Sequence, residues 1–179
     1  MKKAKLLWMD LEMTGLDPLE DSILEVAMII TDFQLKELVR YKGVVKVSEK
    51  LIEKRMVGEF WEKNQEVRKV LIKQNKKGKN REKIEREILE LVDKYQGEEI
   101  YLAGNSIHQD RKFIDLELKE LAKRLHYRML DVSAWKVYFE NALGKKMIKK
   151  EQHRAMDDIV RSIGSHRSEE RRVGKECRS

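Results

Sequence analysis

Runs of apolar residues early in the chain have the length and composition of β-strands. Lys5–Met13, Ser22–Phe33 and Leu35–Ser48 are rich in β-branched or large apolar residues, and short polar breaks separate them. Such runs predict strands, and their short connections favour an antiparallel meander. The connection 14–21 holds a glycine and the chain's only proline, which indicates a turn.

Helical spacing of apolar residues dominates the rest of the chain. In Arg81–Tyr95, for example, apolar side chains recur at every third or fourth position. The same reasoning predicts helices over Leu51–Lys73, Ser106–Leu125, Ala134–Gly144 and Glu151–Gly164, and short strands over Ile100–Asn105 and Tyr127–Ser133. Three strands followed by helices that alternate with short strands predict an α/β fold, a mixed β-sheet flanked by helices.

Composition restricts the class of protein without identifying it. The 179 residues fit a single domain, which we place at residues 1–166, and the net charge is +7. That excess suits a phosphate-rich partner, but a solvated basic surface explains it equally well. No apolar run approaches the roughly 20 residues of a membrane span. The only cysteine, Cys177, fits a reducing compartment and a cytoplasmic location.

The last segment, residues 167–179, differs from the rest of the chain in kind. Besides the cysteine it has one clear hydrophobic residue, Val173, and it shows no helical stripe. It also resembles the in-frame translation of a sequencing adapter. We therefore expect residues 167–179 to be a non-native tail and the helix before it to be truncated.

Two carboxylates at the end of the first strand are the first candidates for chemistry. Asp10 and Glu12 are two positions apart in the predicted strand Lys5–Met13, so both project from one face, about 6.7 Å apart. Carboxylates so placed repel unless a cation lies between them, and Mg²⁺ prefers such oxygen ligands. A strand end that reaches solvent, with both acids hydrated, is the alternative.

A strand-to-helix turn provides the second candidate. Gly104 and Asn105 fit the turn, Ser106 fits a helix N-cap, and Asp110 lies in the first helical turns. The start of a helix suits a phosphate group. Asp110 would add a third carboxylate, although an ordinary acid on an exposed helix face fits as well.

The third candidate lies in the final predicted helix. His153 and Asp158 are five residues apart, too far to share a helical face. If His153 precedes the helix, both side chains can still address one point, while Asp157 faces solvent. A histidine beside metal-binding acids can act as a general base on water. A lone surface histidine is the alternative.

Taken together, the three candidates form a pattern. Their order is that of the DEDDh-type 3′–5′ exonucleases, which have a ribonuclease-H-like fold with three antiparallel strands followed by parallel ones. The segments WMDLEMTGLDP, GNSIHQDRKF, HYRMLDVS and HRAMDDI resemble the motif blocks of the oligoribonuclease family within that group. The resemblance extends from about Leu6 to Ile163, and it implies that residues 1–166 are an exonuclease domain.

The resemblance implies a two-metal hydrolysis of phosphodiester bonds. Four acids would hold two divalent ions, Mg²⁺ or Mn²⁺, and His153 would deprotonate the attacking water. The four acids are Asp10, Glu12, Asp110 and Asp158. The implied substrate is short single-stranded RNA, cut down through dinucleotides to mononucleotides.

The resemblance also implies substrate contacts and a homodimer. Leu16 would wedge against the bases, Ser106 would lie near the terminal phosphate, and Trp61 would lie near the substrate. Tyr127 and Arg128 would reach into the partner subunit's site and cap the 5′ phosphate. That cap would limit substrates to short chains.

One region departs from the family pattern. Glu66 stands where the family has a histidine, and no Ser-Gly-Leu follows it. The basic run Arg68–Arg86, with nine basic and two acidic residues, is available to supply the missing phosphate contact or is simply a solvated face. Two other functions therefore stay open: a related exonuclease that trims DNA or structured RNA 3′ ends, and a nucleic-acid-binding relative that does not cleave.

Overall fold

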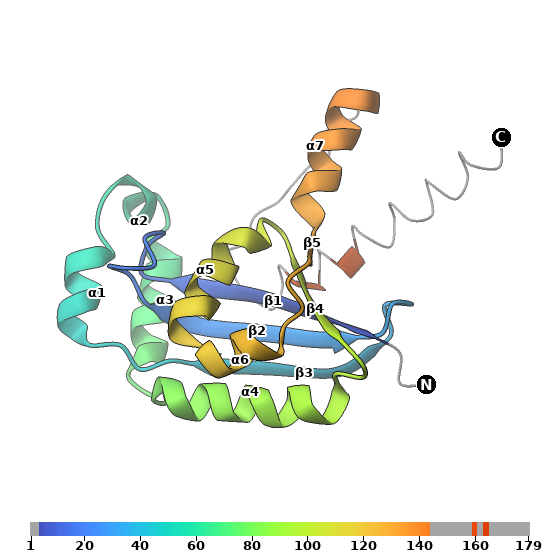
Figure 1. Cartoon of the computed structure of the whole chain (residues 1–179). Helices are drawn as coiled ribbons and strands as arrows, with labels where there is room; N and C mark the ends of the chain where they lie inside the picture. The colour runs from blue at the N-terminus through green and yellow to red at the C-terminus, as the bar shows by residue number, and fades with distance from the viewer. Residues whose placement is uncertain (1–3, 144–158, 161–162, 165–179) are drawn as a thin grey trace.

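A five-stranded mixed sheet forms the centre of the computed structural model, which describes residues 4–143, 159–160 and 163–164. The strands are β1 (Lys5–Met13), β2 (Ile23–Thr31), β3 (Glu37–Val44), β4 (Ile100–Gly104) and β5 (Met129–Asp131). Their spatial order is β3-β2-β1-β4-β5 (Figure 1). The first three pair antiparallel, and β4 and β5 continue parallel to β1. The predicted mixed α/β sheet is confirmed.

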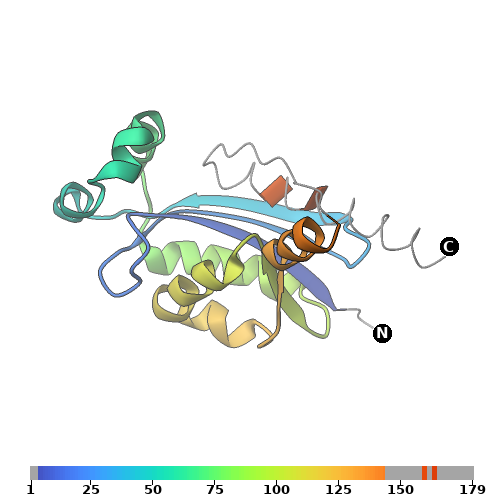
Figure 2. The ribbon, with the colours of Figure 1, turned by 90° about the horizontal axis from the view of Figure 1, so that it is seen from above.

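The helices gather in three places around this sheet. They are α1 (Glu49–Arg55), α2 (Glu59–Lys63), α3 (Gln65–Asn75), α4 (Arg81–Tyr95), α5 (Ile107–Glu117), α6 (Lys119–Arg124) and α7 (Val132–Leu143). Helices α4, α5 and α6 cover one face, whereas α1 and α2 lie beyond the end of the sheet, near the loop that follows β1 (Figures 1 and 2). Helix α7 follows β5 and extends away from the sheet (Figure 1).

Strand β1 contributes to two separate apolar clusters because its side chains alternate between the faces. Leu7, Met9 and Leu11 pack in the larger core, with the apolar stripes of α4 and α5. Leu6 and Trp8 face the other way, in a smaller cluster that contains Ile29, Val132 and Ile159. Asp10 and Glu12 belong to this second face by the same alternation, as predicted.

Two of the predicted helices are broken. The segment 51–73 divides at Gly58, whose φ of 90° is a conformation that other residues rarely adopt, and again at Asn64. The segment 106–125 divides at Leu118, which separates α5 from α6. Apolar spacing continues through these breaks because each short helix turns its own apolar residues to the same core.

The C-terminal predictions mostly lie outside the described residues. Of the predicted helix 151–164, only 159–160 and 163–164 are described, and they are helical. The proposed tail at 167–179 is not described. Within the described ranges, no helix has the length and apolar character needed to cross a membrane.

Candidate active site

The site lies where β1 extends beyond the end of its parallel neighbour, β4. The ladder between β1 and β4 ends at the pair Trp8 and Ala103, so the last residues of β1 pair only with β2. The half-buried side chains of Asp10 and Glu12 lie on this free stretch. The carboxyl ends of neighbouring parallel strands are the usual ligand-binding edge of an α/β sheet.

Asp110 of α5 occupies the gap beside β1. Its Oδ1 accepts a hydrogen bond of 2.9 Å from the backbone N–H of Leu11, the residue between Asp10 and Glu12. The fold thus brings a side chain from 99 residues away onto the strand that carries the first two acids. This is the juxtaposition that the sequence pattern predicted.

The environment of Asp110 is unusual for a carboxylate. The residue is only 6% exposed, and burial, with a smaller contribution from the charge of Asp131, raises its pKa to about 7. None of the ion pairs formed by the described residues involves it. A buried charge without a cation is costly, so a bound cation would relieve that cost.

The complete set of predicted ligands extends beyond the described residues. Asp10, Glu12 and Asp110 do not by themselves close into a metal-binding group within the described part of the chain. His153 and Asp158 lie outside it, as does Asp157. Ile159, the next residue after Asp158, is buried in the cluster of Trp8, on the face from which the β1 acids project. Carboxylate donors of this kind suit Mg²⁺ or Mn²⁺.

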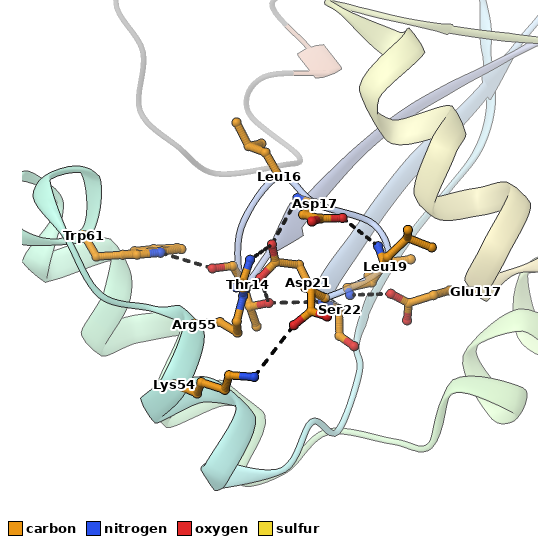
Figure 3. A network of polar contacts seen from close by, with 12 residues as sticks. Thr14, Leu16, Asp17, Leu19, Asp21, Ser22, Lys54, Arg55, Trp61 and Glu117 are labelled. Carbon is orange, nitrogen blue, oxygen red and sulfur yellow. Dashed lines mark hydrogen bonds and ion pairs between the residues drawn. The ribbon is translucent and has the colours of Figure 1, made fainter.

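The loop after β1 is held by a second buried acid, Asp21 (Figure 3). The hydroxyl of Thr14 and the backbone N–H of Asp17 donate hydrogen bonds to its carboxylate, and Arg55 binds both oxygens at 2.8 Å. Although burial raises the pKa of Asp21, the hydrogen bonds from Arg55 and Thr14 outweigh it and leave the pKa below its usual value. Gly15 must be glycine here, because a Cβ would lie 2.5 Å from a carboxylate oxygen of Asp21.

Leu16 and Trp61, both predicted to contact substrate, have opposite exposures. Leu16 is 72% exposed and points away from the loop (Figure 3), while Gln109 of α5 donates a hydrogen bond of 2.6 Å to its carbonyl. Trp61 is buried, and its indole N–H donates to the carbonyl of Thr14 at 3.2 Å. Trp61 therefore supports the loop that presents Leu16.

Ser106 occupies the N-cap position of α5, but its side chain does not cap the helix, and that prediction was wrong. Its side chain makes no capping hydrogen bond, because the residue is left-handed, with φ of 55°. Instead its backbone N–H donates to Asp131 Oδ1 at 3.0 Å. The strained turn is thus held by a side chain from the end of β5.

Asp131 is a residue that the sequence reasoning missed. Ser133 donates to it from both its backbone N–H and its hydroxyl. Burial raises the pKa of Asp131, but the hydrogen bonds from Ser133 and Ser106 outweigh it and leave the pKa below its usual value. Its position at the carboxyl end of a parallel strand was the available signal.

Tyr127 and Arg128 lie at the opposite end of the sheet from the acids. Tyr127 is 74% exposed and packs on His126, which packs in turn on Tyr101 near the start of β4. Tyr101 pairs with Leu6, four residues before Asp10, which corresponds to about 13 Å along β1. The fold does not bring this pair to the acids of its own chain.

A pocket of about 270 Å³ adjoins Trp61. Arg68 and Lys69 line it, whereas Glu66 does not. Glu66 is exposed and accepts a hydrogen bond of 2.7 Å from Lys69. The carboxylate of Glu66 is therefore offset by Lys69, and the pocket itself is lined by Glu62 as well as by the two basic side chains.

Comparisons with known proteins show the family to which this chain belongs. A family model described as an exonuclease matches residues 7–164. The chain is 35% identical to an oligoribonuclease of Neisseria meningitidis serogroup C over 90% of its length and 88% of the relative's. It is 38% identical to an oligoribonuclease of Ralstonia nicotianae, over 88% of this chain and 74% of the relative.

Solved structures show the same fold at lower sequence identity. An exonuclease I from Methylocaldum szegediense superposes with a TM-score of 0.60 and 15% identity over 90% of this chain. A zinc-bound complex of Escherichia coli exonuclease I with single-stranded DNA has a TM-score of 0.57 and 12% identity over 91% of this chain. This chain spans 39% of each of those chains.

Proposed function

This chain belongs to the oligoribonuclease family of exonucleases, and we propose that it removes mononucleotides from the 3′ ends of short oligoribonucleotides, down to dinucleotides. The observation that carries the proposal is the placement of Asp110 on the backbone of Leu11, between Asp10 and Glu12. A site for divalent cations at the carboxyl end of β1 supports phosphodiester hydrolysis.

Each residue of the proposed site has a distinct task. Asp10, Glu12, Asp110 and Asp158 hold two divalent ions, which supply positive charge to the scissile phosphate and to the attacking water. His153 accepts the proton of that water as general base. The hydrogen bond from Leu11 keeps one oxygen of Asp110 fixed, so its other oxygen is free to turn toward the cations.

Substrate selection is proposed to depend on two chains. Leu16 lies against the bases, with its loop supported by Trp61, and Ser106 lies near the terminal phosphate. Tyr127 and Arg128 are exposed, and Arg128 stacks on the Tyr127 ring at 5.2 Å, so the pair is arranged to act on a neighbouring molecule. We propose a homodimer in which this pair caps the 5′ phosphate in the partner's site. The cytoplasm is the proposed location.

Substrate comparison tests the proposal directly. Purified protein is incubated with a labelled RNA dinucleotide, a longer RNA or a DNA oligomer, each with Mg²⁺ or with EDTA. Fast, metal-dependent cleavage of the dinucleotide is the expected result. Preference for DNA or for the longer RNA would indicate an end-trimming exonuclease, and binding without cleavage would indicate a non-cleaving relative.

Shared sites can be tested by mixing inactive chains. Asp10→Ala and Arg128→Ala chains should each have low activity on dinucleotides. Random reassociation should restore about a quarter of wild-type activity, because half of the dimers then hold one intact site. Arg124→Ala, which alters an exposed arginine on α6, is the control and should keep full activity. Mixtures that stay inactive would contradict the shared site.

A further inference from the structure

A buried glutamate lies directly beside the proposed metal ligands. Glu25 of β2 is the cross-strand partner of Glu12 in the β1–β2 ladder, so their side chains share one face. Directly opposed residues of this kind have Cβ atoms about 4.5–5.5 Å apart. The Glu25 side chain is only 2% exposed. Two like charges so close are unfavourable unless another charge offsets one of them.

Both oxygens of Glu25 are bound by groups from outside β1. Lys42 of β3 lies 2.9 Å from Oε1, and the side-chain amide of Gln74 donates to Oε2 at 2.9 Å. Lys42 comes from β3, the strand beside β2 (Figure 1), whereas Gln74 comes from helix α3. Glu25 is therefore turned toward Lys42 and is not a ligand of a cation held by Glu12.

Strand register places Lys42 in line with the other acid as well. Asp10 pairs with Ala27, and Ala27 pairs with Lys42, so the three occupy one row across the sheet on the same face. Two strand spacings separate Asp10 from Lys42, which is about 10 Å. Ala27, which lies between them, is fully buried in the cluster of Trp8. The ammonium group of Lys42 thus lies within electrostatic range of the proposed cation site.

We propose that Glu25 and Lys42 form a charge pair that sets the affinity of the Asp10–Glu12 site for divalent cations. The inference rests on the proposed function, because it requires these acids to hold metal. Neither residue touches metal or RNA; both act through Glu12 and Asp10 as positioning residues. Glu25 attracts cations to the site, and Lys42 limits that attraction.

The two charges have opposite effects, which makes the pair testable. Removing Glu25 leaves Lys42 to repel a cation, whereas removing Lys42 leaves Glu25 to attract one. At a separation of about 10 Å near a protein surface, Coulomb's law gives an effect of about 100-fold or more on the affinity for a divalent ion, and salt screening reduces it to about tenfold or more. A merely structural role would move affinity in the same direction in both variants.

The experiment measures Mn²⁺ binding by titration calorimetry without RNA, at about pH 8 for every variant. Glu25→Gln should weaken binding about tenfold and Lys42→Met should tighten it, while the double variant should return near the wild type. Glu37→Gln and Arg40→Met are matched controls, because they alter an exposed ion pair on the same strand, and each should leave affinity nearly unchanged.

The outcomes separate this inference from the proposed function. Wild-type protein that binds no Mn²⁺ overturns both. Wild-type protein that binds Mn²⁺ but cleaves no RNA overturns the proposed function alone. If wild type binds and the two variants shift affinity in the same direction, or not at all, the charge pair is wrong. Should Glu25→Gln fail to fold, Lys42→Met decides, because only a charge role predicts tighter binding.

Discussion

Asp21 and Asp110 are both buried carboxylates near the end of β1, 5% and 6% exposed, yet their surroundings are opposite. Asp21 has a resident cation, because Arg55 binds both of its oxygens. Asp110 has one backbone N–H from Leu11 and no ion pair with the described residues. The pKa of Asp21 is accordingly lowered, whereas burial raises that of Asp110 to about 7.

The comparison distinguishes an acid that holds the fold from one that is available to a ligand. The charge of Asp21 is neutralised within the chain, and the result is an ordered loop (Figure 3). The charge of Asp110 is left for a cation from outside, at a cost in stability of the free protein. Perturbed carboxylates of this second kind concentrate at functional sites.

The largest expected effect is the loss of activity in Asp110→Asn. The asparagine oxygen can still accept the hydrogen bond from Leu11, so the fold should persist, but the anionic ligand is gone. We expect a loss in kcat/KM of at least about 10³-fold on an RNA dinucleotide. Asp115→Asn is the control, since Asp115 is an exposed acid on the same helix. Near-normal turnover by Asp110→Asn would contradict a role as ligand.

Asp21→Asn should instead lower stability. It leaves Arg55 without its carboxylate and weakens the hydrogen bonds to the loop, so we expect a loss of about 3 kcal/mol in the free energy of unfolding. Urea denaturation measures it, with Glu20→Gln as an exposed control in the same loop. A variant that keeps full stability but loses all activity would reverse the assignment of the two acids.

The stability of the metal-free protein should depend on pH through Asp110. Its pKa is about 7 in the folded state and near 3.8 in the unfolded state. Between these values the folded state holds an extra proton, so its stability falls as the pH rises, and above pH 7 the loss is complete.

We therefore expect Asp110→Asn to be more stable than the wild type by up to about 4 kcal/mol at pH 8 and about equal to it at pH 4. Urea denaturation at both pH values, in EDTA, measures the difference. Adding Mn²⁺ at pH 8 should stabilise the wild type and leave the variant unchanged. A difference that does not vary with pH would show that Asp110 is already ionised in the free protein.

The smallest expected effect concerns the support of the Leu16 loop. Trp61→Phe removes the hydrogen bond to the Thr14 carbonyl and part of the buried ring, which should cost about 1 kcal/mol in thermal unfolding. KM for the dinucleotide should rise more than kcat falls, because the loop positions the bases. Phe60→Leu, at a half-exposed neighbouring position, is the control. Equal effects of the two substitutions would argue against this support.

Sequence patterns correctly predicted the helices and strands that are determined by the spacing of nearby residues. The stripe in Arg81–Tyr95 corresponds to α4, residue for residue, because that helix buries one continuous apolar face. The segment 51–73 was mispredicted because its three short helices follow the end of the sheet, and apolar spacing alone does not show where a chain turns. Among its breaks, Gly58 carries the local signal.

The candidate site also has a part that the sequence predicted and a part that it did not. Alternation along one strand was enough to place Asp10 and Glu12 on one face, and motif order selected Asp110, which the structure places on the backbone of Leu11. His153 and Asp158 stay predictions. The sequence reasoning missed the support of the site: Asp131 holds a turn 25 residues earlier, and Asp21 holds a loop through Arg55. An acid that holds the fold and an acid that is available to a ligand look alike in a sequence, because their partners come from other elements.

The sequence by itself determined the strand and helix periods, the pair of acids on one face of β1, and the family. The periods and the pair of acids depend on the spacing of neighbouring residues, whereas the family depends on the resemblance of four motif blocks to those of known members. Only the tertiary structure decided that Asp110 would meet the backbone of Leu11, that Arg55 would neutralise Asp21, and that Glu25 would lie opposite Glu12. Those contacts depend on strand order and register, which bring together residues that no local pattern relates.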